Sequence, residues 1–389
     1  MGKQQVTSGA LRVVITGGGT GGHLFPGVAI AQEFRARDPQ NKTIFIGTGK
    51  SIEMSILSKT PFKYKSIVAE GIKGRGFVKL VRSILKIPRG IFESILILKG
   101  FRPDLVIGVG SYSAGPVVIG AWLLGIKIVL HEQNVLPGVT NRILSHFADR
   151  IYVSFNYTKA GFNPQKVRVT GNPVRHEILQ CKRNQSKPKI EEGTEIADLR
   201  PGFSQDRLPF TILIVGGSQG AHSLNLAVME AVEYIKERDK FFFVHQTGAD
   251  DEKRVKDTYL RYGIACTVKS FFDDMAKHYQ KADLVICRAG ATTVAEVMAI
   301  GKGAIFVPYP FAADNHQVLN ARSIADRGAA EMILQRDFSG KLLARRINYY
   351  ASKPEALYRM AARAREFGRP DAARIIVDDC YKLIEPKLN

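Results

Sequence analysis

The chain has 389 residues, 45% of them apolar, and a formal net charge of +20 at pH 7. This length allows two domains of ordinary size, each with its own hydrophobic core. The four cysteines are widely spaced without a C-x-x-C pair, which argues against a disulfide framework or a zinc site and suits a reducing cytoplasm. The positive charge points to an anionic partner, such as nucleic acid, anionic lipid or a phosphorylated substrate.

The N-terminal MGKQQVTSGALR lacks the apolar core of a secretory signal. The most hydrophobic window is VVIGAWLLGIKIVL at 117–130, which follows Pro116 and contains Lys127. At about fourteen residues it is too short to cross a bilayer. We expect a buried helix followed by a strand there, and no transmembrane helix.

Two glycine-rich loops divide the chain into similar halves. LRVVITGGGTGGH at 11–23 and FTILIVGGSQGAH at 210–222 each join a β-prone run to a glycine loop. Helix-like segments follow, GVAIAQEFRAR at 27–37 and SLNLAVMEAVEYIKE at 223–237. The pattern predicts an α/β fold with two Rossmann-like domains that face each other across a cleft.

Further short apolar runs alternate with helical stretches, as a parallel α/β architecture requires. They include KTIFIG, PDLVIGVG, KIVLHEQ, RIYVSF, KVRVTGNP, FFFVHQTG, ADLVICRAG and GAIFVPYP. The stretch 181–208 is polar without apolar periodicity, and is interpreted as a surface insertion or linker. The expected organisation is an N-terminal domain (1–175), a linker (176–208), a C-terminal domain (209–368) and a final helix (369–389) packing back on the first domain.

Two nucleotide motifs are only superficially matched. Gly17, Gly19 and Gly22 fit the dinucleotide pattern G-x-G-x-x-G, but the second predicted strand, KTIFIGTGK, ends without the acid that a ribose needs. IFIGTGKS at 44–51 has Ile44 where a P-loop begins with glycine. A nicotinamide cofactor is therefore not expected. A tight turn without a ligand is the alternative for either loop, although helix N-termini after such loops favour anions.

Six motifs together resemble the MurG family, the peptidoglycan N-acetylglucosaminyltransferases of the two-domain GT-B class. They are GGTGGHLFPG, HEQNVLPGVTNR, GNPVR, GGSQGA, RAGATTVAE and the pair Asp314 and Gln317. The resemblance implies transfer of N-acetylglucosamine from UDP-GlcNAc to the 4-hydroxyl of the muramyl sugar of undecaprenyl-pyrophosphoryl-MurNAc-pentapeptide, with inversion and without a metal or other cofactor. The main departure from the family pattern is the insertion at 181–208.

The resemblance also implies a donor site. Glu296 would accept ribose hydroxyls from the first turn of a helix whose N-terminus binds the diphosphate, and Phe272 would meet uracil through its backbone. Gln317, in a loop with Asp314, would bind sugar hydroxyls. A helix-start charge at Glu296 and a helix cap at Gln317 are the alternatives. The implied UDP-GlcNAc-binding residues are Thr20, Gly21, Gly22, Asn134, Arg175, Ser218, Phe272, Ala291, Thr292, Thr293, Val294, Ala295, Glu296 and Gln317.

The catalytic base has two candidates. His23 stands at the edge of the first glycine loop, and an imidazole of near-neutral pKa is suited to accept a proton from an alcohol. Glu132 in HEQN is the competing base, with Asn134 beside it as a sugar or nucleotide contact. His23 could instead be a helix-start histidine that bonds phosphate or backbone. The loop Thr20–Gly22 also suits the acceptor pyrophosphate.

Positive charge gathers between Lys59 and Arg102, where eleven Lys or Arg face only Glu70 and Glu93. A basic amphipathic segment of this kind can lie on an anionic membrane surface. A core-packed helix with a solvated basic side is the alternative. A lipid-linked acceptor favours the membrane, at the cytoplasmic face of the bacterial inner membrane, and no nucleic-acid-binding module is recognised. The residues expected to meet acceptor or membrane are Phe77, Lys79, Arg82 and Lys86.

Overall fold

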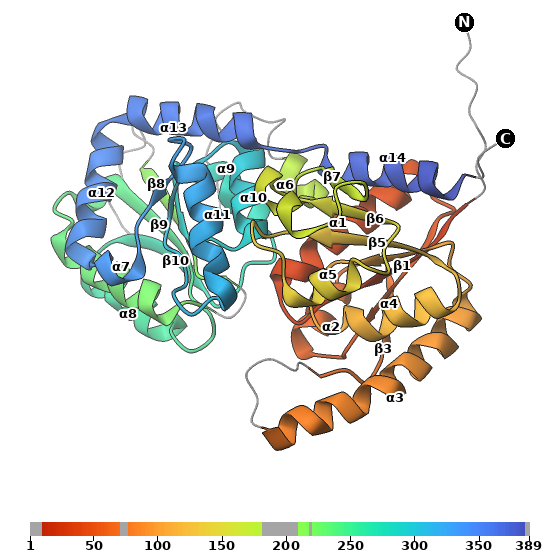
Figure 1. Cartoon of the computed structure of the whole chain (residues 1–389). Helices are drawn as coiled ribbons and strands as arrows, with labels where there is room; N and C mark the ends of the chain where they lie inside the picture. Colours follow the sequence, from red (N-terminus) through yellow and green to blue (C-terminus); the bar gives the residue numbers. More distant parts are fainter. Residues whose placement is uncertain (1–9, 71–76, 181–208, 218–219, 386–389) are drawn as a thin grey trace, which may run out of the picture. The chain divides into compact units, whose positions relative to one another are not determined.

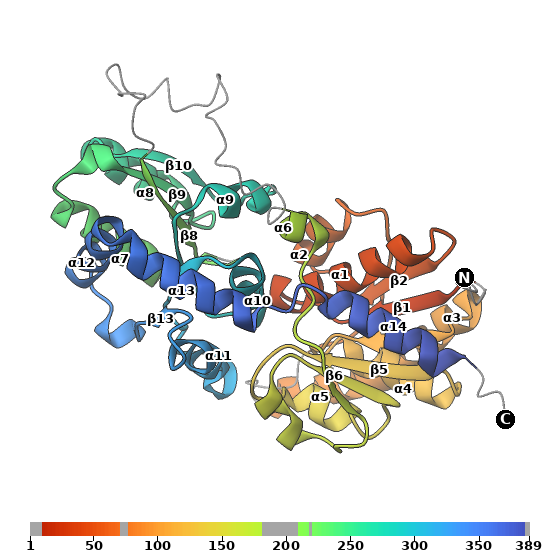
Figure 2. The same cartoon turned by 90° about the horizontal axis from the view of Figure 1, so that it is seen from above.

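The computed structural model describes residues 10–70, 77–180, 209–217 and 220–385, with the backbone alone for 77–85, 159 and 160. The predicted insertion at 181–208 and Ser218 lie outside the described residues. The chain forms two compact units (Figures 1 and 2). Unit 1 comprises Met1–Arg175 with Arg369–Asn389, and unit 2 comprises His176–Gly368.

The described part of unit 1 contains one parallel sheet of seven strands in the order β3-β2-β1-β4-β5-β6-β7. Val14 in the central strand pairs with Ile44 on one side and with Val106 on the other. This is the Rossmann strand order, extended by one strand. The strands are β1 (Arg12–Thr16), β2 (Lys42–Gly47), β3 (Lys63–Ser66), β4 (Leu105–Gly108), β5 (Lys127–Glu132), β6 (Arg150–Val153) and β7 (Val167–Val169).

Helices cover both faces of the unit 1 sheet, because successive strand residues point to opposite sides. Val13 and Ile15 pack with α1, α2 and α14, whereas Val14 packs with α3, α4 and α5. In Figure 2, α14 from the chain's C-terminus runs beside α1, and the two helices are in contact. The helices are α1 (Gly21–Arg37), α2 (Ser51–Leu57), α3 (Phe77–Phe101), α4 (Ala114–Leu123), α5 (Val139–Leu144), the 3₁₀ helix η1 (Asn156–Gly161) and α14 (Ala372–Ile384).

Unit 2 repeats this plan around a six-stranded parallel sheet, counted over its described residues, in the order β10-β9-β8-β11-β12-β13. Its strands are β8 (Phe210–Val215), β9 (Phe241–Gln246), β10 (Ala265–Lys269), β11 (Leu284–Cys287), β12 (Gly303–Phe306) and β13 (Glu331–Met332). Its helices are α6 (His176–Gln180), α7 (His222–Tyr234), η2 (Arg238–Lys240), α8 (Glu252–Arg261), α9 (Met275–Lys281), α10 (Ala291–Ile300), η3 (Ala313–Asn315), α11 (His316–Ala325), η4 (Gln335–Asp337), α12 (Gly340–Ser352) and α13 (Pro354–Phe367).

The two sheets confirm the predicted pair of Rossmann-like domains. In each sheet the strand order reverses at one point, between β1 and β4 in unit 1 and between β8 and β11 in unit 2. Ligands of open parallel sheets bind at the carboxyl ends of the strands at such a point. Both glycine loops, which follow β1 and β8, lie there.

The structure can be compared with the helical segments that the sequence predicts at 117–130 and 27–37. The window at 117–130 forms the end of α4 and most of β5, which confirms a helix followed by a strand. In the part of the chain that the structure describes, no helix is long and apolar enough to cross a membrane. The helix-like segment expected at 27–37 is part of α1, which begins earlier, at Gly21, and includes His23 and Pro26. Thr20 is its extended N-cap, and the helix tolerates a proline near its beginning.

Candidate functional site

The glycine loop after β1 is built by close contacts that exclude side chains. A Cβ atom on Gly17 would lie 2.5 Å from the Gly110 carbonyl oxygen, and Gly17 has a φ of +135°. A Cβ atom on Gly18 would lie 2.3 Å from an oxygen of Glu53. The amide of Gly19 donates a hydrogen bond to that same carboxylate over 2.8 Å. Packing against β4 and α2 therefore requires these glycines, before any ligand is considered.

The carboxylate that the glycine loop packs against belongs to Glu53 of α2, which is buried with 1% of its surface exposed. Its carboxylate also accepts from the amides of Thr48 (2.9 Å) and Gly49 (3.1 Å) and from the Tyr64 hydroxyl (2.8 Å). Burial raises the pKa of the Tyr64 hydroxyl, which keeps it a donor. The sequence reasoning missed Glu53 because it looked for an acid at the end of the second strand, and Glu53 stands just beyond, in α2.

His23 lies in the first turn of α1 with its ring anchored on one side. Its Nδ1 is 3.2 Å from the carbonyl oxygen of Val109 and 3.2 Å from Oε1 of Gln133. A carbonyl oxygen can only accept, so Nδ1 carries the hydrogen. In the neutral ring the lone pair is then on Nε2. This arrangement presents an acceptor nitrogen at the switch point of unit 1.

Glu132 is held very differently. It is 2% exposed, and its Oε1 accepts from the amide and the side-chain nitrogen of Asn134 (3.0 and 3.2 Å). Its Oε2 accepts from the amide of Gly138 (3.0 Å) and from Nδ2 of Asn141 (2.9 Å). Four donors thus surround the carboxylate, which shapes the loop after β5 and orients Asn134.

The other predicted residues of unit 1 surround the N-terminus of α1. Thr20 is the N-cap and makes no side-chain cap bond, and Gly21 and Gly22 open the helix. The Arg175 guanidinium lies 4.0 Å from the centre of the Phe25 ring. Phe25 itself leaves no room for a Cβ on Gly21, at 2.9 Å. Arg175 therefore packs over the first two turns of α1.

In unit 2, the predicted diphosphate residues form the N-terminus of α10 directly after β11. Gly290 is the N-cap, so no side chain caps the helix, and Ala291, Thr292 and Thr293 are its first three residues. An uncapped helix N-terminus offers backbone N–H groups and a partial positive charge to an anion. The switch point of unit 2 is thus electrostatically suited to a phosphate.

Val294, Ala295 and Glu296 continue α10. The prediction that Glu296 lies in the first turn was wrong, since the helix begins five residues earlier and Glu296 is in its second turn. The residue is 5% exposed, and the Tyr279 hydroxyl of α9 donates to its Oε2 over 3.2 Å. A buried carboxylate needs such partners, so Tyr279 helps to hold Glu296 in place.

The prediction that Gln317 lies in a loop was also wrong. Asp314 is in the short helix η3, and Gln317 is in the first turn of α11. Asp314 and Asn315 both have positive φ, 53° and 56°, a backbone conformation that is uncommon for residues other than glycine. Oε1 of Gln317 accepts from the Tyr309 amide over 2.9 Å, which fixes the orientation of its side-chain amide.

Phe272 is buried, and its ring packs 4.1 Å from that of His278, as centroid distance. Its backbone N–H donates to Oε1 of Gln246 over 3.0 Å. The side-chain nitrogen of Gln246 donates in turn to the Gly217 carbonyl over 3.2 Å. Gln246 therefore joins the second glycine loop to the segment around Phe272. The Phe272 amide is thus engaged within the protein.

A second histidine that the sequence reasoning missed follows the second glycine loop. His222 begins α7, and its Nδ1 lies 3.0 Å from both carboxylate oxygens of Asp251. Nδ2 of Asn225 donates to Asp251 over 2.7 Å, and Oδ1 of Asn225 accepts from Nε2 of the buried His245 over 3.0 Å. The signal was present, since GGSQGAH at 216–222 ends in a histidine at the position where GGGTGGH at 17–23 does.

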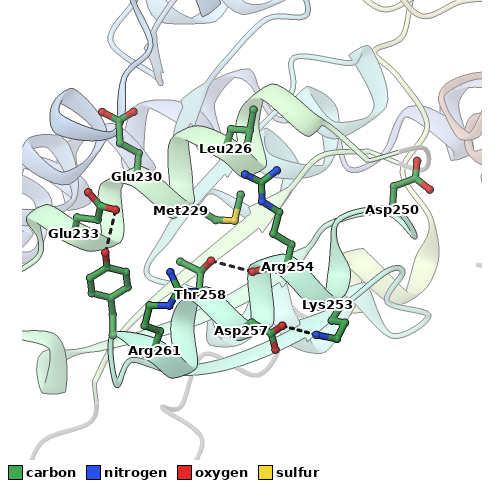
Figure 3. A pocket seen from close by; sticks show the side chains of 11 residues that line it. Leu226, Met229, Glu230, Glu233, Asp250, Lys253, Arg254, Asp257, Thr258 and Arg261 are labelled. Atoms are coloured by element: carbon green, nitrogen blue, oxygen red, sulfur yellow. Dashed lines mark hydrogen bonds and ion pairs between the residues drawn. The ribbon is translucent and has the colours of Figure 1, made fainter.

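A surface hollow of ≈ 570 Å³ lies between α7 and α8 (Figure 3). Charged side chains dominate its wall, and several are paired, Lys253 with Asp257 and Tyr262 with Glu233. None of the residues predicted from the sequence lines it. Among the described residues, no group of three His, Cys, Asp or Glu side chains is arranged to hold a metal ion.

The basic segment forms α3, a 25-residue helix with Pro88 inside it. The side chains of Phe77, Lys79 and Arg82 lie outside the described residues. Lys86 forms an ion pair with Glu70, and Arg89 pairs with Glu93 at 2.9 Å. The two acids of this region thus each neutralise one base. More than half exposed are Phe92 and Leu96 of α3, Trp122 and Leu123 at the end of α4, and Ile143 of α5.

Comparison with protein families matches both units. Residues 13–153 match the glycosyltransferase family 28 N-terminal domain, and residues 211–376 match the glycosyltransferase family 28 C-terminal domain.

Individual relatives agree over nearly the whole chain. The chain is 43% identical to the UDP-N-acetylglucosamine–N-acetylmuramyl-(pentapeptide) pyrophosphoryl-undecaprenol N-acetylglucosamine transferase of Syntrophus aciditrophicus, over 96% of this chain and 99% of that protein. It is 42% identical to the protein of the same name from Geobacter sulfurreducens, over 95% of this chain and 98% of that protein. The crystal structure of Acinetobacter baumannii MurG superposes with a TM-score of 0.72 at 31% identity, over 96% and 99%. A UDP-GlcNAc 2-epimerase from Neisseria meningitidis shares the fold, with a TM-score of 0.65 at 15% identity over 95% and 99%.

Proposed function

The chain belongs to the UDP-N-acetylglucosamine–N-acetylmuramyl-(pentapeptide) pyrophosphoryl-undecaprenol N-acetylglucosamine transferases, with both domains of glycosyltransferase family 28, and we propose that it catalyses the transfer that this name describes. N-acetylglucosamine leaves UDP and joins the 4-hydroxyl of the muramyl sugar of the lipid-linked acceptor, with inversion at the anomeric carbon. The reaction needs an anchor for the departing diphosphate and an acceptor for the hydroxyl proton.

We propose that His23 takes that proton. The observation that carries this role is the contact of its Nδ1 with the Val109 carbonyl, because it leaves the Nε2 lone pair as the basic group of the neutral ring. As the acceptor oxygen bonds to the anomeric carbon and the bond to UDP breaks, the hydroxyl proton passes to Nε2. Glu132 is the weaker candidate, since four donors already surround its carboxylate.

For the donor, we propose that the uncapped N-terminus of α10 binds the diphosphate, with Ala291, Thr292 and Thr293 as its first residues. Departure of UDP increases the negative charge there, and fixed N–H donors stabilise that charge. Glu296, which Tyr279 supports, accepts ribose hydroxyls. Gln317 bonds hydroxyls of the transferred sugar. The remaining proposed donor contacts are Asn134, Arg175, Ser218, Phe272, Val294 and Ala295.

For the acceptor, we propose that the amides of Thr20, Gly21 and Gly22 at the start of α1 meet its pyrophosphate, although the family pattern assigns this loop to the donor. The amide of Gly19 is engaged by Glu53, so the anion contacts fall on the helix start.

We propose that unit 1 also binds the cytoplasmic surface of the inner membrane. Exposed apolar side chains on the neighbouring helices α3, α4 and α5 support this, among them Phe92, Trp122 and Ile143. Basic residues such as Arg142 and Lys99 accompany them on these helices, and anionic lipid attracts such residues. The basic segment that carries Phe77, Lys79, Arg82 and Lys86 belongs to the same helix, α3.

The decisive experiment measures UDP release from UDP-GlcNAc in EDTA, with and without an undecaprenyl-pyrophosphoryl-muramyl-pentapeptide acceptor. Release that depends on the acceptor, together with a disaccharide product, supports the transfer and its independence of metal. Equal release without the acceptor contradicts the transfer. Release that requires added Mg²⁺ contradicts the metal-free mechanism alone.

A further inference from the structure

We propose that Gln133 and His131 are positioning residues that fix the tautomer of His23 through a chain of buried hydrogen bonds. The inference rests on the proposed role of His23 as the base of the transfer. Both residues belong to the segment that ends β5, and both are almost completely buried, at 1% and 0% exposure.

The orientation of the Gln133 side-chain amide follows from one contact. Its Nε2 lies 2.8 Å from the Val109 carbonyl oxygen, which can only accept a hydrogen bond. The amide nitrogen must therefore face Val109. Oε1 then faces His23, whose Nδ1 is 3.2 Å away. The opposite orientation would place an acceptor against the Val109 carbonyl.

The second hydrogen of the Gln133 amide is directed to His131. Its Nε2 is 3.1 Å from Nδ1 of His131, while Nε2 of His131 is 3.4 Å from the carbonyl oxygen of Gly171. Because Gly171 can only accept, His131 carries its hydrogen on Nε2 and accepts from Gln133 on Nδ1. This assignment requires a neutral ring. Burial lowers the pKa of His131 to about 4, so the ring is neutral at pH 7.

The series of hydrogen bonds ends at the carbonyl of Gly171, whose backbone is closely packed. Gly171 has a φ of +88°, and a Cβ atom there would lie 2.4 Å from Cβ of Arg369. The segment that leads into α14 thus packs against Gly171, and the Thr170 hydroxyl donates to the Gly171 carbonyl over 3.1 Å. Every donor in this series meets an acceptor, and the series ends with Nδ1–H on His23. The other tautomer of His23 would place two lone pairs against each other at Gln133.

Other groups besides Gln133 also face the His23 ring. Val109 O accepts from both His23 and Gln133, and Nδ1 of His23 would be only 3.0 Å from a Cβ on Gly110. The titratable group that interacts with His23 through space is His131. Without Gln133, the Val109 carbonyl alone keeps the ring in place, so the tautomer preference weakens and is not abolished.

The test compares the wild type with Gln133→Leu, which keeps the size of the side chain and removes both polar atoms. Nitrogen-15 NMR of labelled histidine, assigned with His23→Gln, reads the tautomer directly, without any activity. We expect Nε2 of His23 to be the unprotonated nitrogen in the wild type and a mixture of tautomers in Gln133→Leu. The kcat of transfer should fall about tenfold, which is only part of the factor of about 10²–10⁴ that a general base contributes. The donor KM should stay within about twofold.

Tyr152→Phe is the matched control, because it removes a hydroxyl that donates to Asp379 over 2.9 Å and lies 3.6 Å from Sγ of Cys380, on the side of the unit 1 sheet that α14 covers. It should leave the His23 tautomer unchanged. Nε2 of His23 protonated in the wild type, or an unchanged tautomer and kcat in Gln133→Leu, would overturn the inference. A wild type that shows this tautomer but no acceptor-dependent UDP release would overturn the proposed function instead.

Discussion

The backbone amide of Gly19 donates a hydrogen bond to the Glu53 carboxylate, with 2.8 Å between nitrogen and oxygen. A glycine loop of this type usually directs its amides at a phosphate, whereas here one of them is used by an anion of the chain itself. Glu53 also binds the amides of Thr48 and Gly49, so it ties the loop after β1 to the loop after β2. The first loop is therefore held in its shape without a ligand.

Replacing Glu53 by Gln should loosen this loop. The glutamine amide has one acceptor oxygen for donors that now share two, so at least one buried N–H or O–H loses its partner. The free energy of unfolding should fall by about 1–3 kcal/mol, and the acceptor KM should rise. Tyr64→Phe removes a single donor and should have a smaller effect. Equal unfolding midpoints for Glu53→Gln and the wild type in urea, with an equal acceptor KM, would refute the role given to Glu53.

The sequence was informative wherever local pattern and burial agreed. Runs such as PDLVIGVG and ADLVICRAG became the buried central strands β4 and β11, because continuous apolar runs suit parallel strands covered on both faces. The short edge strand β3, with its sequence KYKS, was missed because it buries little and carries charge, whereas the edge strand β7 was predicted from KVRVTGNP. Motif order alone indicated the family.

Partners distant in sequence could not be predicted. Nothing near His23 reveals that Gln133, 110 positions later, bonds its ring. The same holds for Tyr279 and Glu296, which neighbouring helices bring together. One helix start was placed poorly, since Gln317 was expected in a loop and lies in the first turn of α11. In α1 the glycines Gly21 and Gly22 form the first turn, and Pro26 lies one turn further on.

Tyr279→Phe should weaken donor binding specifically. It removes the hydroxyl that donates to Oε2 of Glu296 and keeps the buried ring. The donor KM should rise several-fold, with kcat nearly unchanged, because ribose contacts bind ground and transition states alike. Glu296→Ala should raise the donor KM by more. Steady-state kinetics with the acceptor saturating measures both. A fall in kcat at constant KM would contradict the ribose assignment.

Stability should fall as the solution becomes acidic. Burial lowers the pKa of His131 from its ordinary 6.5 to about 4. Between pH 6.5 and about pH 4, His131 is therefore protonated in the unfolded chain but stays neutral in the folded chain. The free energy of unfolding falls as the pH decreases through this range. The slope is about 1.4 kcal/mol per pH unit, or roughly 3 kcal/mol in all. Burial lowers the pKa of His245 in unit 2 to about 3, with the same sign.

Trp122, the single tryptophan of the chain, lies in unit 1 and reports the unfolding of that unit by fluorescence. His131→Gln should remove the slope between pH 6.5 and 4 from the urea transition that Trp122 detects. Asp251, whose pKa is lowered by hydrogen bonds from Asn225 and His222 that outweigh the effect of its burial, loses its contribution only at lower pH. A wild-type transition that does not change over this pH range would contradict the neutral, buried state of His131.

Charge placed on the exposed apolar side chains of unit 1 should impair membrane binding. Phe92→Glu and Leu96→Glu each remove a side chain whose burial in the lipid interface would contribute about 1.5–3 kcal/mol. Affinity for vesicles rich in phosphatidylglycerol should fall about tenfold or more for each change, while activity on a short-chain soluble acceptor persists. Ile375→Glu, on the exposed side of α14, is the matched control and should bind as the wild type does. An equal loss of vesicle binding and of transfer to the soluble acceptor would indicate damage to the fold.

The choice between His23 and Glu132 as the base follows from what each replacement disturbs. His23→Gln removes the Nε2 lone pair from an anchored ring, so kcat should fall by about 10²–10⁴ while donor affinity, measured by calorimetry, is retained. Glu132→Gln places an amide against donors from Gly138 or Asn134, which should lower the free energy of unfolding by about 1–3 kcal/mol. Its remaining activity should exceed that of His23→Gln, because the base is intact. If instead Glu132→Gln lowers kcat by about 10²–10⁴ and His23→Gln does not, Glu132 is the base and the carboxylate gives up its loop contacts when substrate binds.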